Sequence, residues 1–221
     1  MTTTFPDISI STDRLTMRPL DDEDATALAD LMNDELVTTW LAVPHPYTLN
    51  DALHHIRVAA PAERAEGRGI VLAVTEFLTQ RLVGVISLGA TDWRLGSAEL
   101  SYTIGPWARG EGYACEAALA VAQWAFRDQR LERLELRTAA GNTAAQQVAQ
   151  KIGCISEGVL RNAWIARSPI EDGGWADTRT DLIVWGLLPE DIEDLCLDDA
   201  GLAEAGGYPG LADWNALADR R

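Results

Sequence analysis

The sequence predicts an α+β fold in which a mixed, mostly antiparallel sheet is flanked by helices and followed by an acidic C-terminal extension. Three β-rich runs at residues 70–77, 82–88 and 98–104 are joined by short polar connections, which favours an antiparallel meander. A helical stripe of apolar residues follows the third run directly, so helices pack on this sheet. The whole pattern predicts strands and helices in the order βααβββαβαββ.

The N-terminal part predicts one strand and two helices. Residues 14–20 alternate apolar and polar side chains, which predicts a short strand. Asp21 can cap a helix that ends near Asn33. A second helix is expected over residues 48–66, broken or kinked at Pro61 because proline lacks the N–H that a helix interior requires.

The remaining elements alternate between helix and strand. Apolar residues at positions i, i+3, i+4 and i+7 between Cys115 and Phe126 predict a helix with one buried stripe. Strands are expected at residues 131–138, 155–166 and 180–187, and a further helix at residues 142–152.

The length of 221 residues indicates one domain with an appendage, because a typical domain has roughly 150 residues. We expect a domain over residues 8–188 and an acidic extension over residues 189–221, in which nine acids face only Arg220 and Arg221. Apolar residues in this extension favour docking on its own domain, a homodimer contact or a lid over the active site.

Composition and charge exclude several classes of function. With 47% hydrophobic and 24% charged residues, the chain is of the globular type that buries a core. The 18 basic and 34 acidic residues give a formal net charge of −16. Such a surface repels DNA, RNA and anionic membranes and attracts amines. We therefore expect a cationic partner, no DNA and no membrane.

The cysteines and histidines predict neither disulfides nor a metal site. Cys115, Cys154 and Cys196 stand far apart, and the three histidines share no ligand spacing with an acidic or cysteine partner. No targeting segment or membrane span is visible, so we expect a soluble cytoplasmic protein.

The loop at residues 105–114 carries the most specific signal. Gly110 and Gly112 permit backbone conformations in which successive N–H groups point at an anion, and a helix begins directly afterwards. A nucleoside-triphosphate loop is excluded because it needs a lysine, and the chain contains only Lys151. A dinucleotide-binding loop is disfavoured because Cys115 stands where its third glycine is required.

Residues 109–114 have the form R-x-x-G-x-A, which resembles the acyl-CoA pyrophosphate signature of the GNAT N-acetyltransferases, in particular the RimJ/RimL type. The resemblance extends over about residues 10–188, through the similar stretches 14–20, 98–102 and 142–158. It implies a sheet whose fourth and fifth strands are splayed. It also implies an N-acetyltransferase that uses acetyl-CoA and transfers the acetyl group directly to an amine in a ternary complex.

The resemblance also implies which residues bind the acyl donor. Pantetheine would lie along the splayed strands and the pyrophosphate on the loop. These positions are Thr103, Ile104, Arg109, Gly110, Glu111, Gly112, Tyr113, Ala114, Asn142 and Lys151. The alternative role for Lys151 is that of an exposed cation that complements the dipole of its helix.

Two catalytic groups are expected. Glu99 shares one strand face with Ser101 and Thr103, and we predict that it accepts the proton of the amine. Its alternative role is to bond neighbouring backbone or an arginine. Ala145 stands where relatives carry a serine that returns a proton to the thiolate. Tyr113 or Tyr102 can replace that serine, or the thiolate leaves without help.

For the acceptor, the resemblance implies Trp40, Glu99 and Asp177 near the entrance, although Asp177 could merely cap a turn. The acceptor is a protein N-terminus, an amino acid or polyamine, or an antibiotic amine. Two alternative functions remain open: a transferase that uses another acyl donor, including acyl-tRNA, and a non-catalytic CoA-binding regulatory protein.

Overall fold

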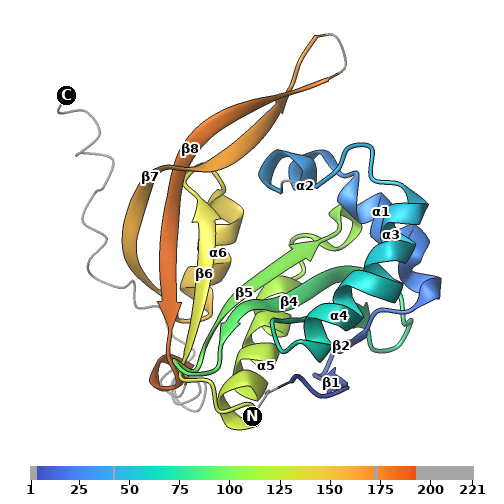
Figure 1. The fold of residues 1–221 in the computed structure, drawn as a ribbon. Helices are drawn as coiled ribbons and strands as arrows, with labels where there is room; N and C mark the ends of the chain where they lie inside the picture. The colour runs from blue at the N-terminus through green and yellow to red at the C-terminus, as the bar shows by residue number, and fades with distance from the viewer. Residues whose placement is uncertain (1–3, 42, 172–173, 193–221) are drawn as a thin grey trace, which may run out of the picture.

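The computed structural model describes residues 4–41, 43–171 and 174–192. These residues form an eight-stranded sheet with helices on both faces (Figure 1), which confirms the predicted α+β class. Neighbouring strands are antiparallel throughout the order β1-β2-β3-β4-β5-β6-β8-β7, except that β5 and β6 are parallel. The strands are β1 (Ile10–Ser11), β2 (Leu15–Pro19), β3 (Ile70–Glu76), β4 (Leu82–Asp92), β5 (Ser97–Ile104), β6 (Arg133–Ala139), β7 (Ile155–Pro169) and β8 (Trp175–Leu187).

The parallel pair β5 and β6 is joined only at one end. Residues 97–99 of β5 pair with residues 133–135 of β6, and the two strands then diverge (Figure 1). The remaining five residues of β5 leave about 16 Å of strand edge without a β6 partner. The diverging strands form an open V, with the paired residues 97–99 and 133–135 at its apex. This is the splayed pair of strands that the family resemblance implies.

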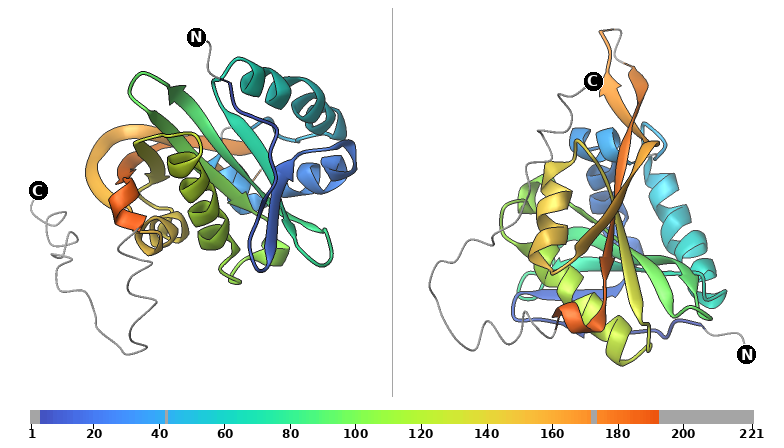
Figure 2. Two further views of the ribbon diagram at one scale, coloured as in Figure 1. Left: turned by 90° about the horizontal axis from the view of Figure 1, so that it is seen from below. Right: turned by 90° about the vertical axis from the view of Figure 1, so that its left-hand side faces the viewer.

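Different helices cover the two faces of the sheet (Figure 2). Strand alternation directs Leu72, Ile86 and Leu100 to the face that packs against α5, and Ala73 and Val85 to the face that packs against α1 and α3. The helices are α1 (Ala25–Met32), α2 (Glu35–Trp40), α3 (Leu49–His54), α4 (Ala60–Ala65), α5 (Tyr113–Arg127) and α6 (Thr143–Lys151). Two short 3₁₀ turns lie at Asp22–Asp24 and Pro106–Ala108.

The helical segment expected over residues 48–66 forms, and its α-helical winding is interrupted just before Pro61. The backbone passes from α3 through a π-helical turn, His55–Ala59, directly into α4 without a break. Pro61 lies in the first turn of α4, where the missing N–H costs least. The π-helical turn before Pro61 is wider than an α-helical turn, so it accommodates a proline that the interior of a regular α-helix would not.

Two elements are not predicted by the sequence pattern. Helix α2 forms because the Asp34 carboxylate accepts the N–H of Val37 at 3.2 Å and starts a new helix directly after α1. Strand β1 has two residues, too few for an alternation to show. Strands β4, β7 and β8 are longer than expected, while residues 193–221 of the predicted acidic extension lie outside the described residues.

Candidate active site

The loop between β5 and α5 adopts the glycine-dependent backbone that its sequence predicts. Gly110 and Gly112 have φ angles of +85° and +79°, in the left-handed region that other residues rarely adopt. Gly112 is the N-cap of α5 and offers no side chain to the first N–H groups of that helix, among which is the N–H of Ala114. These N–H groups and the positive end of the helix dipole are therefore available to an anion.

Arg14, the residue before β2, holds this loop in place. Its Nη1 donates to the carbonyl of Glu111 at 3.0 Å, and its Nε donates to the Glu116 carboxylate of α5 at 2.7 Å. The guanidinium also lies 4.9 Å from the ring centre of Tyr113. This role of Arg14 is not predicted from the sequence, because the two bonds join residues 97 and 102 positions apart and no local sequence pattern reveals such contacts.

Arg109, the first residue of the R-x-x-G-x-A signature, is engaged by a carboxylate. Its guanidinium forms an ion pair with Asp34, the N-cap of α2, and its Nε donates to the carbonyl of Ile104 at 3.2 Å. The loop that is expected to receive an anion is thus tied to α2. Asp34 is a second residue that the sequence analysis missed as part of this site.

Glu99 lies at the apex of the V. It forms the last register pair with Glu135 before β5 and β6 diverge. Its carboxylate is 3.6 Å from Nε of Arg137, and 32% of its side-chain surface is exposed. Partial burial raises the pKa of the Glu99 carboxyl above its ordinary value, while Arg137 lowers it and Glu135 raises it further. A carboxylate with a raised pKa that solvent can reach is suited to accept a proton.

Thr103 and Ile104 lie on the diverging part of β5, between Glu99 and the loop. Both are half-buried, and neither has a register partner on β6. Ser101 on the same stretch bonds Ser87 of β4, with 2.8 Å between their hydroxyl oxygens. This edge therefore offers backbone groups and small polar side chains to an extended molecule.

Helix α6 borders the other arm of the V. Asn142 caps it by accepting the N–H of Ala145 at 3.1 Å, and the hydroxyl of Tyr102 donates to the carbonyl of Ala145 at 3.3 Å. Lys151 lies in the last turn of α6. Its charge partly offsets the burial that raises the pKa of Cys115, which indicates that Lys151 lies near the first turn of α5.

Two of the three residues predicted at the acceptor entrance, Trp40 and Asp177, lie at the β7–β8 ribbon and the end of α2, which contact each other. The Trp40 indole packs on Gly141, and the Trp40 carbonyl accepts the indole N–H of Trp164 on β7 at 3.2 Å. Asp177 on β8 forms an ion pair with Arg167 on β7, with 3.4 Å between its carboxylate and Nε.

Within the described residues, no cluster of histidine, cysteine, aspartate or glutamate could hold a metal ion. Cys115 and Cys154 are free thiols, and Cys196 lies outside the described residues. In the described part of the chain, no helix has the length and apolar character needed to cross a bilayer.

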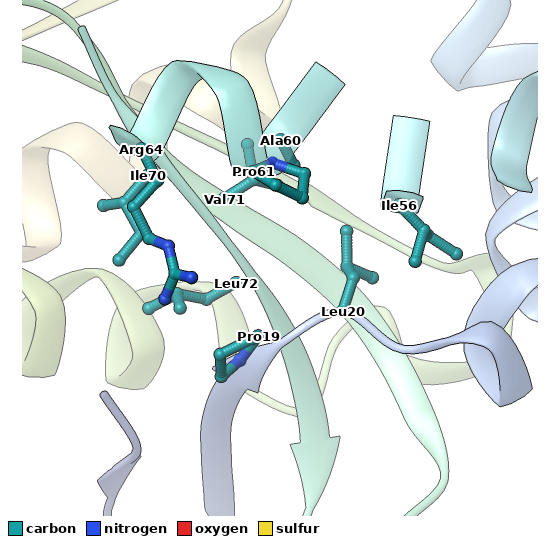
Figure 3. A pocket seen from close by; sticks show the side chains of 9 residues that line it. All are labelled: Pro19, Leu20, Ile56, Ala60, Pro61, Arg64, Ile70, Val71 and Leu72. Atoms are coloured by element: carbon teal, nitrogen blue, oxygen red, sulfur yellow. The ribbon is translucent and has the colours of Figure 1, made fainter. Parts of the chain in front are cut away.

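A small hollow lies between the end of β2, strand β3 and the helical segment 55–65 (Figure 3). It measures about 50 Å³ and is lined mainly by aliphatic side chains, including Leu20, Ile56 and Leu72. None of the residues predicted to bind the acyl donor or the amine lines this hollow. The open V is the better candidate for the site.

Comparison with known proteins identifies the family. Residues 14–155 match the acetyltransferase (GNAT) domain family. The chain belongs to this family. It is 30% identical over 152 residues to the uncharacterized N-acetyltransferase YoaA of Bacillus subtilis, covering 69% of this chain and 85% of YoaA. The chain is accordingly an N-acetyltransferase of the GNAT family.

Solved structures share the same fold. The RimJ of Mycobacterium smegmatis, in complex with CoA-disulfide, has a TM-score of 0.71 at 19% identity, over 87% of this chain and 95% of RimJ. The spermidine N-acetyltransferase of Vibrio cholerae, in complex with CoA and spermine, has a TM-score of 0.68 at 18% identity, over 82% of this chain and 98% of that chain. The fold that the resemblance to RimJ/RimL-type acetyltransferases implies is therefore confirmed.

Tyr113, one of the residues predicted to be catalytic, lies away from the apex of the V. The Tyr113 hydroxyl is 3.4 Å from a carboxylate oxygen of Glu76 on β3, two strands away from β5. The structure does not bring it together with Glu99, and the role of Tyr113 as proton donor to the thiolate stays a prediction. Tyr102, the second hydroxyl considered, is the one that reaches Ala145.

Proposed function

We propose that this chain is an acetyl-CoA-dependent N-acetyltransferase that moves an acetyl group directly to a primary amine in a ternary complex. The observation that carries the proposal is the open V between β5 and β6. At its mouth is a loop with two left-handed glycines, and at its apex is a carboxylate with a raised pKa. An extended acyl donor and an amine can meet at Glu99 in this arrangement.

The residues fit such a donor in two respects. The first N–H groups of α5 and the left-handed backbone at Gly110 and Gly112 suit a pyrophosphate. The free edge of β5 at Thr103 and Ile104 suits the amide-containing pantetheine arm, which pairs with a strand edge as a neighbouring strand does. Lys151, Asn142, Arg109, Glu111, Tyr113 and Ala114 complete the proposed binding surface.

The chemistry assigned to the protein is proton transfer and charge stabilisation. An amine attacks a thioester only when it is neutral, so a base must remove its proton. Glu99 is proposed to do this directly or through one water. Free N–H groups of the β5 edge stabilise the oxyanion that forms on the carbonyl.

The departing thiolate is proposed to receive a hydrogen bond from Tyr102, whose single O–H turns from the Ala145 carbonyl to the sulfur. Burial raises the pKa of Tyr102 well above its ordinary value, so its hydroxyl keeps its proton and acts as a donor. A thiolate with a pKa of about 8 to 9 is a stable leaving group when such a donor is present. This assignment replaces the serine that is missing at Ala145.

The proposed acceptor is a cationic primary amine, on a protein N-terminus or a small molecule such as a polyamine or an antibiotic. Two observations support a cationic acceptor. The formal net charge is −16, and the fold is shared with a spermidine N-acetyltransferase. Trp40 and Asp177 are proposed to shape the entrance through which the amine reaches Glu99.

The test is release of free thiol from acetyl-CoA across a panel of polyamines, amino acids, aminoglycosides and peptides with free N-termini. Turnover with one class is expected and identifies the acceptor. Silence across the panel, with CoA binding retained in calorimetry, contradicts the proposal. That result would favour another acyl donor or the non-catalytic CoA-binding protein.

A further inference from the structure

A row of alternating charges crosses the sheet at the apex of the V. From β5 to β7 it contains Glu99, Arg137, Glu135, Arg133 and Glu157. Each arginine lies between two carboxylates, so the three acids and two bases leave one negative charge in excess. The proposed base is thus the end member of a network and not an isolated carboxylate.

The register of the sheet builds this row. Glu99 pairs with Glu135 on β6, and Glu135 pairs with Gly186 on β8. Gly186 has no side chain, and Arg133 and Glu157 occupy the space it leaves. A Cβ atom there would lie 2.3 Å from a Glu157 carboxylate oxygen and 2.8 Å from Nη1 of Arg133.

One nitrogen of Arg137, Nε, lies close to two carboxylates. Its Nε donates to Glu135 at 2.8 Å, and the same nitrogen is 3.6 Å from the Glu99 carboxylate. The shorter distance is a hydrogen bond and the longer one an ion pair without a hydrogen bond. Glu135 and Glu99 therefore compete for the charge of the same guanidinium.

We propose that Arg137 is a positioning residue for the reaction. It holds the Glu99 carboxylate at the apex of the V, and Glu135 competes for its guanidinium, so this pair sets the pH above which the base is active. The proposal rests on the proposed function, in which Glu99 is the base. It adds two residues that do not touch the reacting atoms.

Among the described residues, the charged groups that face Glu99 come from β6. On β4, the register partner of Glu99 is Gly89, which has no titratable group, and the next pair on the same face is the Ser87–Ser101 hydroxyl contact. On β6 the facing groups are Glu135 and Arg137. Removing either one should therefore change the protonation of Glu99 in a known direction.

The experiment compares the acid limb of the pH profile of kcat/KM for three variants. Arg137→Gln removes the cation, so the midpoint of the acid limb should move to higher pH by about 0.5 to 1 unit. Glu135→Gln removes the like charge and weakens the competing hydrogen bond to Arg137, so the midpoint of the limb should move to lower pH by about the same amount. Arg137→Lys should restore most of the wild-type profile. The ionisation of the acceptor is common to all variants and cancels in the comparison.

Glu157→Gln is the matched control. It removes a carboxylate of the same row whose recorded partner is Arg133, with no contact to Glu99. Its profile should not shift. Shifts of the same sign in Arg137→Gln and Glu135→Gln, or no shift in both, would overturn the proposal.

A second readout separates this proposal from the proposed function. In protein labelled with ¹³C at glutamate carboxyls, the signal lost in Glu99→Gln identifies Glu99, and its titration can be followed without any substrate. Opposite shifts of this titration in the two variants are expected. If they occur in a protein without acetyltransferase activity, the proposed function fails while the electrostatic coupling holds. If activity depends on Glu99 and the titration does not shift, only the inference fails.

Discussion

The hydroxyl of Tyr102 donates a hydrogen bond to the carbonyl of Ala145, the position at which related acetyltransferases are expected to carry a serine. A residue on β5 thus brings a hydroxyl to the place where α6 lacks one. The contact joins β5, one arm of the V, to α6, the helix that borders the other arm.

Tyr102→Phe should lower kcat about ten-fold, which corresponds to ~1.4 kcal/mol, because the thiolate loses one hydrogen-bond donor. Tyr113→Phe should leave kcat unchanged, since the Tyr113 hydroxyl faces Glu76. Steady-state kinetics with saturating acetyl-CoA measures both. A loss of kcat in Tyr113→Phe and none in Tyr102→Phe would reverse the assignment of the two hydroxyls.

Gly112→Trp should abolish CoA binding. The backbone at Gly112 has a φ of +79°, and an indole at the N-cap of α5 would occupy the space in front of the first N–H groups. Calorimetric titration with CoA measures the loss, and circular dichroism checks the fold. Gly158→Ala is the control, because a Cβ there meets open space outside the loop. Retained affinity in Gly112→Trp would refute the loop as the pyrophosphate site.

Asp34→Asn should strengthen acetyl-CoA binding by about two- to ten-fold. The substitution removes a negative charge beside Arg109, while asparagine still caps α2. The gain should shrink at high salt because the effect is electrostatic. The dissociation constant at two ionic strengths tests this. Weaker binding would show that Asp34 aims Arg109 at the phosphates instead of competing with them.

Gly84→Ala should destabilise the fold by about 1 to 3 kcal/mol. A Cβ at Gly84 would lie 2.3 Å from the carbonyl oxygen of Thr103 on β5, a backbone atom that cannot move aside cheaply. Gly89→Ala on the same strand should cost far less, since a Cβ there meets no atom within 4 Å. Urea unfolding of both variants measures the difference. Equal stability of the two would contradict the described packing of β4 on β5.

Sequence patterns predicted those parts of the fold that depend only on residues close together in the chain. Alternation and helical spacing predicted β3 to β6 and α5, and the glycines at 110 and 112 predicted a left-handed loop. The divergence of β5 and β6 came from the family resemblance, because no local pattern states where two strands stop pairing.

The long-range contacts of the site could not be predicted in this way. Arg14 bonds Glu111, and Arg109 pairs with Asp34, across sequence separations of 97 and 75 positions. Arg137 belongs to a strand whose alternation predicts that its side chain points away from the core but not which carboxylate it meets. Charge partners of this kind are set by the register of the sheet, which only the folded structure gives.

The most direct test of the account is the rate of thiol release from acetyl-CoA by Glu99→Gln, measured with the best amine acceptor. Glutamine preserves the shape of Glu99 but accepts no proton. The rate should therefore fall by about 10²- to 10⁴-fold, with acetyl-CoA affinity nearly unchanged. A wild-type rate in this variant would contradict the central claim that Glu99, at the apex of the V, is the base of the acetyltransferase.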